Sequence, residues 1–370
     1  MDQSKRFLSL DVLRGMTVTL MIVVNTPGNG ATTFAPLHHA SWHGFTPTDW
    51  VFPTFMFVVG NAMSFSLVKY ESLGNGAFLK KVFKRTLLIF LLGYLMYWFP
   101  FVYENEAHQW AMAPLANTRI LGVLQRIALG YCFGSLILYY WKERGAVIFS
   151  IVALLGYWLL MVAFGDLTME GNAGSKLDTL ILGDNHLYHG EGIAFEPEGI
   201  LSTFPSVVNV IFGYFAGRFI QNKGNTYETI AKLMLAGALL AFAALCWDLV
   251  FPINKKLWTS SFVLYTVGLD LWILAILLYA IEILNYRRWT YFFEVFGKNT
   301  LFIYLLSELG AILLDFFQTG DRSWHRAIYQ NVLEPLAGSH VGSLLYAIAW
   351  MMVCWLVGYF MDKRRIYVKV

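Results

Sequence analysis

The sequence predicts an all-α integral membrane protein, a polytopic helical bundle of about ten transmembrane helices with both termini in the cytoplasm. Three observations support this fold class. Hydrophobic residues make up 57% of the 370 residues, charged residues only 14%, and the mean hydropathy is +0.54. Apolar residues form runs long enough to cross a bilayer, and lysine and arginine gather in every second loop. This composition excludes a soluble enzyme and a disordered chain. The chain has no linker or low-complexity tract, so we treat residues 1–370 as one domain.

Each candidate span is an apolar run of roughly 20 residues, the length that a helix needs to cross the hydrocarbon core. We expect helices because they satisfy their own backbone hydrogen bonds in lipid, and the runs lack the alternation of barrel strands. In chain order the candidates are Leu8–Val24, Trp50–Val68, Thr86–Val102, Ile120–Trp141, Ala146–Phe164, Ile200–Ile220, Ile230–Phe251, Ser261–Leu284, Phe292–Phe317 and Val341–Phe360.

The distribution of positive charge predicts the orientation of these spans. Of the 27 Lys and Arg residues, 20 lie in or near the terminal segments and alternate loops, and five lie in the other loops. The remaining two, Arg119 and Arg126, lie at the start of the fourth span and within it. The positive-inside rule places the first set in the cytoplasm. Lys5 and Arg6 precede the first apolar run, but Asp11 and Arg14 interrupt that run, so we interpret it as an uncleaved span and not as a signal peptide.

Several kinds of partner find no support in the sequence. The basic residues are scattered in short clusters, which indicates topology and not a nucleic-acid partner. The three cysteines, Cys132, Cys246 and Cys354, are dispersed in apolar runs and form no disulfide framework or metal motif. His39 and His43 are four residues apart and could share a helix face toward a metal, but no third ligand stands at metal spacing. We therefore expect no metal.

Histidines gather on the side that is predicted to face away from the cytosol. All eight lie in or beside those loops: His38, His39, His43, His108, His186, His189, His325 and His340. The densest polar cluster is the segment 25–49, which holds Asn25, three histidines, Trp42 and Asp49. A histidine here could take a proton from a nucleophile while a carboxylate orients it. The alternatives are ordinary histidines at a membrane interface and, for Asp49, a helix N-cap.

Charged residues within the predicted spans are a second signal, because each is costly in lipid unless it is paired or faces water. Arg126, Asp270 and Glu308 are the deepest, and Lys298 lies near a cytoplasmic end. They could line a polar cavity whose cations suit phosphate groups. Pairing that holds helices together is the alternative, and composition does not choose between them.

Two further segments on the side away from the cytosol combine charged and aromatic residues. Glu196-Pro-Glu198-Gly precedes the sixth span, and Asn254-Lys-Lys256-Leu-Trp258 is a short basic turn that runs against the positive-inside trend. Lys256 could contact a sugar hydroxyl or a carboxylate of a substrate. Simple pairing with Glu196 or Glu198 is the alternative.

The motifs, taken in order, resemble a family of transmembrane N-acetyltransferases related to heparan-α-glucosaminide N-acetyltransferase. The resemblance begins with Arg6-Phe-Leu-Ser-Leu-Asp-Val-Leu-Arg-Gly15, Asn25, His39-Ala-Ser-Trp42 and Asp49-Trp-Val-Phe-Pro53, and continues with Gly122-Val-Leu-Gln-Arg126, Pro197-Glu-Gly199, Asn254-Lys-Lys-Leu-Trp258 and Gly297-Lys-Asn299. Each motif is weak alone, but the ordered set is specific. The chain lacks the long N-terminal extension of the animal proteins, which suggests a bacterial-type member in the cytoplasmic (inner) membrane.

The resemblance implies transfer of an acetyl group from cytosolic acetyl-CoA to the amine of a glucosamine-type sugar on the opposite side. His39 takes the position of the essential histidine, as general base or transient acetyl acceptor. Asn25 is a candidate oxyanion donor, and Asp49 could orient the imidazole. Arg14, Arg126 and Lys298 are candidate contacts for the phosphates of CoA. Trp42, Glu198, Lys256 and Trp258 are candidate contacts for the sugar.

A different class of function stays open alongside this one. A transporter or flippase for a sugar or lipid-linked sugar could use Arg126, Asp270 and Glu308 as a path at the bilayer midplane. The chain shows no internal repeat of the kind many transporters have. Gly213 and Gly217 form a small-residue face suited to close helix packing, within the chain or in a homodimer.

Overall fold

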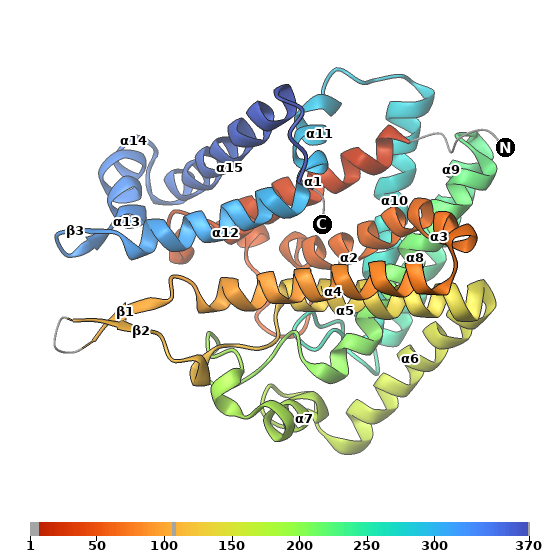
Figure 1. The fold of residues 1–370 in the computed structure, drawn as a ribbon, viewed down its shortest axis with the longest axis horizontal. Coiled ribbons are helices and arrows are strands. Elements are labelled where there is room, and N and C mark those ends of the chain that lie inside the picture. Colours follow the sequence, from red (N-terminus) through yellow and green to blue (C-terminus); the bar gives the residue numbers. More distant parts are fainter. Residues whose placement is uncertain (1–6, 106–108, 369–370) are drawn as a thin grey trace.

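A bundle of long helices makes up most of the molecule (Figure 1). The computed structural model describes residues 7–105 and 109–368, apart from the side chains of Lys69, Glu71 and Ser72. Lys5, Arg6 and His108, which were singled out above, lie outside the described residues. A helix lies over each predicted span: α1 (Leu8–Asn25), α2 (Pro47–Ser66), α4 (Asn75–Trp98), α5 (Val123–Leu136, extended by Ile137–Trp141), α6 (Lys142–Phe164), α8 (Ile200–Lys223), α9 (Tyr227–Asp248), α10 (Ser260–Leu277, extended by Leu278–Ile283), α11 (Thr290–Lys298) with α12 (Thr300–Phe316), and α15 (Ser339–Lys363).

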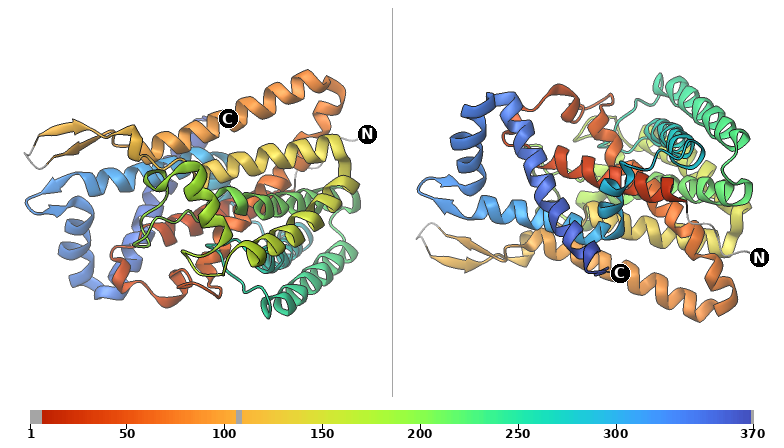
Figure 2. Two further views of the ribbon diagram at one scale, coloured as in Figure 1. Left: turned by 90° about the horizontal axis from the view of Figure 1, so that it is seen from below. Right: turned by 90° about the horizontal axis from the view of Figure 1, so that it is seen from above.

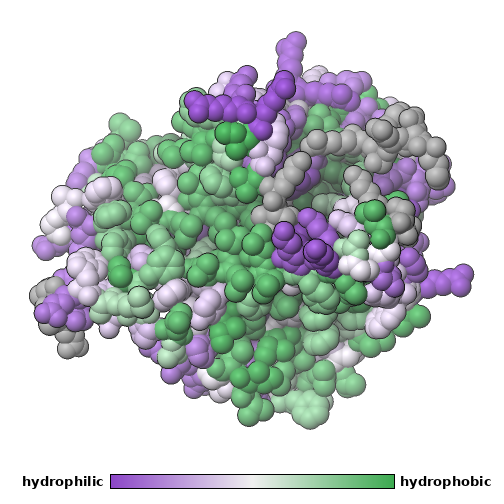
Figure 3. All heavy atoms as spheres, viewed as in Figure 1, coloured by the Kyte–Doolittle hydropathy of each residue, from purple (hydrophilic) through white to green (hydrophobic). Residues whose placement is uncertain are grey.

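The apolar surface of the bundle supports a polytopic membrane protein. By length and composition, six helical stretches of the described chain could cross a membrane, or seven if α11 and α12 count as one span. One of the six is Val123–Phe164, in which the chain reverses at Lys142 between α5 and α6 (Figure 2). Large exposed hydrophobic side chains gather on α4, α6, α9 and α15, for example Leu91, Leu159, Phe242 and Val353. Figure 3 shows hydrophobic residues over the middle and the lower part of one face, with hydrophilic residues gathered toward its top, left and right. The number of ten spans remains a prediction.

Close contact between α2 and α8 forms the centre of the bundle. A Cβ atom on Gly60 would lie 1.8 Å from the carbonyl oxygen of Val210, and one on Gly213 would lie 1.9 Å from that of Phe57. Only glycine allows the two backbones to approach so closely. Gly217 packs against the side chain of Ser64. The small-residue face of α8 is therefore used inside the chain, and no homodimer is needed to explain it.

The structure differs from the predicted spans at two places. The predicted span Phe292–Phe317 is two helices, bent by 83° between Lys298 and Thr300, because the Asn299 side chain bonds the backbone of Ile366 and Val368 in place of continuing the helix. The predicted span Thr86–Val102 ends at Trp98, and Val102 begins the hairpin β1 (Val102–Glu104) and β2 (Trp110–Met112). The remaining short elements lie between the predicted spans: α3 (Val68–Leu73), α7 (Ala173–Leu182), β3 (Gln318–Thr319), β4 (Arg322–Ser323), α13 (Trp324–Ile328) and α14 (Glu334–Ala337).

The loops separate into two ends of the bundle. At one, which we call the His39 end, segments far apart in sequence are joined by the contacts of Trp42 with Leu167, Asn254 with His43 and Lys256 with Glu191. At the other, which we call the basic end, Arg14 contacts Gly297, and Asn299 contacts the C-terminal segment. The fold thus collects the histidine-rich segment and the Arg14–Lys298 region at separate ends.

Candidate active site

The His39 end is built around the start of α2. Pro47 occupies the first position of the helix, and Thr46 and Asp49 form a capping box, in which each side chain bonds the backbone of the other. One Asp49 oxygen, Oδ2, accepts hydrogen bonds from the Thr46 and Ala40 amides, both at 3.0 Å. The other oxygen, Oδ1, lies 2.7 Å from Nδ1 of His39. Asp49 is therefore both the helix cap and the partner of His39.

The pairing with Asp49 sets the tautomer of His39. Since the carboxylate accepts, Nδ1 carries the proton, and Nε2 of the neutral ring keeps its lone pair. The Asp49 side chain is 1% exposed and that of His39 is 43% exposed, so the ring is open to solvent while its partner is not. Partial burial lowers the pKa of His39, and Lys255 lowers it further, against the opposing effect of Asp49. A neutral imidazole with a free lone pair is the form that a general base requires.

Lys255 lies directly beside this ring, although the sequence analysis did not single it out. Its Nζ is 3.1 Å from Nε2 and 3.3 Å from Nδ1 of His39. The turn that presents it is held by Asn254, whose Oδ1 accepts from the Leu257 amide at 2.8 Å, and by Trp258, whose φ is +54°. The sequence signal was the pair of lysines against the positive-inside trend, from which we selected the neighbouring Lys256.

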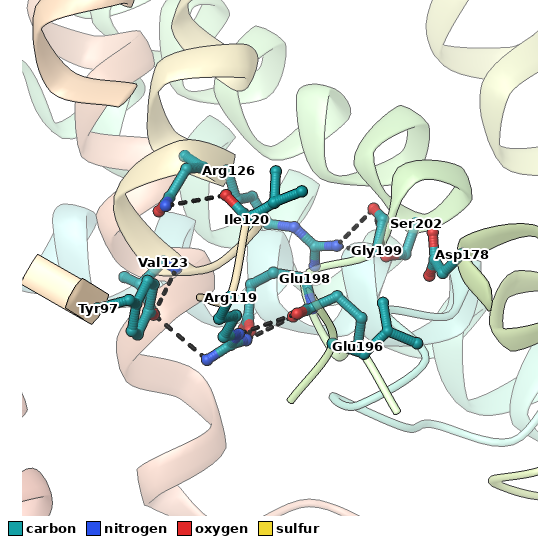
Figure 4. Close-up of polar contacts among 12 residues, drawn as sticks. Tyr97, Arg119, Ile120, Val123, Arg126, Asp178, Glu196, Glu198, Gly199 and Ser202 are labelled. Carbon is teal, nitrogen blue, oxygen red and sulfur yellow. Dashed lines mark hydrogen bonds and ion pairs between the residues drawn. The ribbon is translucent and has the colours of Figure 1, made fainter. Parts of the chain in front are cut away.

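Behind this turn, two arginines and two glutamates form a buried charge network (Figure 4). The Arg119 guanidinium donates to Glu196 at 2.9 Å and to Glu198 at 2.6 Å, and it stacks on Tyr97 and Tyr188. Arg126 donates to the Gly199 carbonyl at 3.2 Å and to Ser202, and its guanidinium lies over the Trp258 ring.

The two carboxyl groups of this network titrate differently. Burial raises the pKa of Glu196 to about 7. Burial acts in the same direction on Glu198, but the cations Arg119, Arg126 and Lys255 outweigh it and lower its pKa. Glu198 is thus the carboxylate that stays ionised, and its charge acts on Lys255.

The candidate sugar contacts are in different situations. Lys256 donates to Glu191 at 2.8 Å and to the Ser41 carbonyl at 3.2 Å. Its carboxylate partner is thus Glu191, while Glu196 and Glu198 are bonded to Arg119. Trp42 donates to the Leu167 carbonyl at 2.8 Å and is half-buried. Glu198 is buried under Arg119. Trp258 is fully buried and bonded to Asn209, so we do not retain it as a sugar contact.

The deep charges and Asn25 are held in separate contacts. Asn25 donates to Glu308 at 3.0 Å. Asp270 accepts from Trp50 at 2.8 Å and from Thr54 at 2.7 Å, which ties α10 to α2. None of the hydrogen bonds described for residues 7–105 and 109–368 joins Arg126, Asp270 or Glu308 to one another. These contacts favour helix pairing over the midplane path that a transporter would need.

The basic end contains a cavity of about 380 Å³. Arg14 and Lys298 line it together with Lys81 and Arg85, and most of the remaining wall is apolar. Arg14 is paired with Asp11, and Lys298 lies 3.0 Å from Asp362. Arg126 is not among the lining residues, because its guanidinium points into the network at the His39 end. The structure therefore places two of the three candidate phosphate contacts, Arg14 and Lys298, in the wall of one cavity.

The cavity is lined by Arg14, Met21, Phe52, Phe55, Val58, Val59, Ala62, Lys81, Arg85, Ile89, Val123, Leu124, Ile127, Gly297, Lys298, Thr300, Leu301, Tyr304 and Val368.

Metal ligation has no support in the described part of the chain. Across residues 7–105 and 109–368, no group of three or more His, Cys, Asp or Glu side chains is placed to hold a metal ion. His39 faces Asp49 and Lys255, whereas His43 faces Asn254, so the two histidines use different partners.

Comparison with known proteins identifies the family. The model of the family described as heparan-alpha-glucosaminide N-acetyltransferase, catalytic, matches residues 6–250, which include His39, Asp49, Arg119 and Glu198. The chain belongs to this family. It is 26% identical to heparan-alpha-glucosaminide N-acetyltransferase of Mus musculus over 429 residues, which cover 100% of this chain and 61% of the mouse protein. The Homo sapiens protein is 26% identical over 425 residues, which cover 99% of this chain and 60% of the human protein. The chain therefore spans about 60% of the length of these relatives.

Proposed function

We propose that this family member is a membrane acetyltransferase that moves an acetyl group from acetyl-CoA to the amine of a glucosamine-type sugar. The observation that carries the proposal is the His39–Asp49 pair, in which Nδ1 of a partly exposed imidazole is bonded to a buried carboxylate. The names of its relatives point to the same reaction. The acceptor approaches the His39 end, and Lys256, Glu191 and Trp42 lie beside it as candidate contacts.

The cavity at the basic end suits acetyl-CoA. Arg14, Lys81, Arg85 and Lys298 at its wall would hold the phosphates, and the apolar lining would hold the pantetheine arm. The positive-inside pattern supports a cytosolic basic end, with both termini there, in a bacterial inner membrane. Phe52 lines the cavity and packs against Trp258, at a ring-centroid distance of 5.0 Å. Since Trp258 is on the turn that carries Lys255, one aromatic contact links the two ends.

The chemistry proposed for His39 is general base catalysis. Its Nε2 takes a proton from the sugar amine while the amine nitrogen bonds to the thioester carbon. Collapse of the tetrahedral intermediate breaks the carbon–sulfur bond, and the proton on Nε2 passes to the CoA sulfur. Asp49 keeps the ring in the reactive tautomer. An acetyl-imidazole intermediate on His39 is the competing route, and it predicts ping-pong kinetics where direct transfer predicts a ternary complex.

The test is transfer of label from acetyl-CoA to glucosamine by the purified chain. We expect wild type to label the sugar and His39→Ala to lose about 10²–10⁴-fold in kcat, because a positioned base contributes that much. His189→Ala is the matched control, since His189 is an exposed histidine bonded to the Leu187 carbonyl. Equal activity of His39→Ala and wild type would remove His39 from the mechanism. Absence of label with wild type would remove the proposed reaction.

A further inference from the structure

We propose that Lys255 is a second catalytic residue, whose ammonium group binds the oxyanion that forms on the thioester carbonyl while His39 takes the proton. This inference rests on the function proposed above. It assigns to Lys255 the role that the family resemblance suggested for Asn25.

The position of Lys255 relative to Nε2 of His39 supports this role. A base must lie about 2.6–3.2 Å from the atom whose proton it takes, so the reacting amine nitrogen binds close to Nε2. In the tetrahedral intermediate that nitrogen and the oxyanion are bonded to the same carbon. A donor 3.1 Å from Nε2, on a flexible four-carbon chain, can therefore reach the oxyanion.

The neighbouring donors are committed elsewhere. Asn25 donates its amide to Glu308, and no hydrogen bond described for it reaches His39. Lys256 donates to Glu191 and to the Ser41 carbonyl. Lys255 is thus the cation of this turn that contacts the candidate base.

Burial outweighs the neighbouring carboxylates, so the pKa of Lys255 lies below its ordinary value. Burial lowers the pKa of Lys255, and the carboxylates of Glu198 and Asp49 oppose that shift. Glu198 is in turn fixed by Arg119, so the negative charge that faces Lys255 belongs to a rigid network. A fixed negative charge of this kind holds the ammonium near the reacting groups before the oxyanion forms.

The Lys255 ammonium is almost equally close to Nε2 and Nδ1 of His39, at 3.1 and 3.3 Å, so it lies beside the imidazole and not on the axis of the Nε2 lone pair. The lone-pair direction of Nε2 is therefore left for the substrate amine, and the ammonium beside it is placed to turn to the carbonyl oxygen of a bound thioester.

The experiment compares Lys255→Met and Lys255→Arg with wild type in the same transfer assay, across a pH series. The charged groups that act on His39 are Asp49, Lys255 and Lys256. Lys255→Met should lower kcat about 100-fold or more, as loss of an oxyanion donor does. It should also move the acid limb of kcat/KM to higher pH, because His39 loses a cation that lowers its pKa. Lys255→Arg keeps the charge and should recover at least about 10-fold of the loss, with the acid limb near its wild-type position. Lys176→Met, at an exposed lysine bonded to the Phe164 carbonyl, is the matched control.

The outcomes separate this inference from the proposed function. No transfer by wild type overturns the reaction itself. The role of Lys255 alone is overturned if wild type is active, the kcat of Lys255→Met is within about twofold of the wild-type value, and the acid limb of its pH profile does not move. A charge-based role is overturned if Lys255→Arg is as stable to heat as Lys255→Met but no more active. That result would indicate that the lysine acts as a base. If Lys255→Met does not fold, Lys255→Arg decides: an unmoved acid limb supports the inference and a shifted one overturns it.

Discussion

The two ends of the bundle use positive charge in different ways. At the His39 end, the Arg119 side chain is 14% exposed, and it is bonded to two carboxylates that are 0% and 9% exposed. At the basic end, the side chains of Arg14 and Lys298 are 29% and 25% exposed, and they pair with Asp11 and Asp362 at the edge of an apolar cavity. The first set of cations is fixed, whereas the second can exchange its partner for a ligand.

This difference matches the demands of the two halves of the proposed reaction. Stabilising a transition state requires charges that are already in place, because reorganising them would consume the gain. Binding a polyphosphate requires accessible cations that release a weak partner for a stronger one. We therefore expect substitutions at the His39 end to act on kcat or stability, and substitutions at the basic end to act on KM for acetyl-CoA.

The largest effect on catalysis after His39 itself should come from Asp49→Asn. The amide can still accept from the Thr46 and Ala40 amides, so the cap survives, but it no longer selects the tautomer with the proton on Nδ1. By analogy with catalytic triads, kcat should fall by about 10²–10⁴-fold. Steady-state kinetics would show this loss with an unchanged KM for acetyl-CoA. Asp321→Asn, in the exposed turn between β3 and β4, should behave as wild type. Full activity of Asp49→Asn would show that the pair with His39 is structural only.

Arg119→Met should destabilise the protein, because it leaves two buried carboxyl groups without their shared guanidinium. Removing one partner of a buried ion pair costs about 3–5 kcal/mol. The loss should be larger at pH 8 than at pH 5.5. Arg119 lowers the pKa of both glutamates, so without it both values rise, and protonation at low pH relieves the buried charge. Thermal unfolding in detergent at the two pH values checks this, with Arg119→Lys as the charge-preserving comparison. An equal loss at both pH values would contradict the electrostatic account.

Sequence reasoning located the helices because hydropathy is a local property of a span. It missed the break at Asn299, although Gly-Lys-Asn was noted as a motif, because the break depends on backbone groups of residues 366 and 368. The hairpin at Val102 was missed because an apolar run predicts a helix but not the residue at which the helix ends.

The site was predicted only in part for a related reason. His39 and Asp49 are ten residues apart and flank one helix start, so a short segment contains both. Lys255 and Lys256 are adjacent, and the sequence offers no ground for choosing between them; the fold of the turn directs Lys255 to His39 and Lys256 to Glu191. Arg126 was assigned to phosphates because it is a cation in a span, but its partners Gly199 and Ser202 are more than 70 residues away in the sequence. The position of a residue within a span does not indicate toward which end of the bundle its long side chain extends to find hydrogen-bond partners.

The smallest effect in this comparison should come from Lys298→Met at the basic end. A charge-assisted hydrogen bond is worth about 1.5–3 kcal/mol, so loss of one phosphate contact should raise KM for acetyl-CoA about 10-fold or more and leave kcat unchanged. The response to salt should weaken as well, because screening acts on the charges that remain. Lys80→Met is the matched control, since Lys80 is exposed on α4 next to Lys81 but does not line the cavity. A fall in kcat with an unchanged KM would place Lys298 with the reaction chemistry, and the contrast between a fixed His39 end and an adaptable basic end would then be wrong.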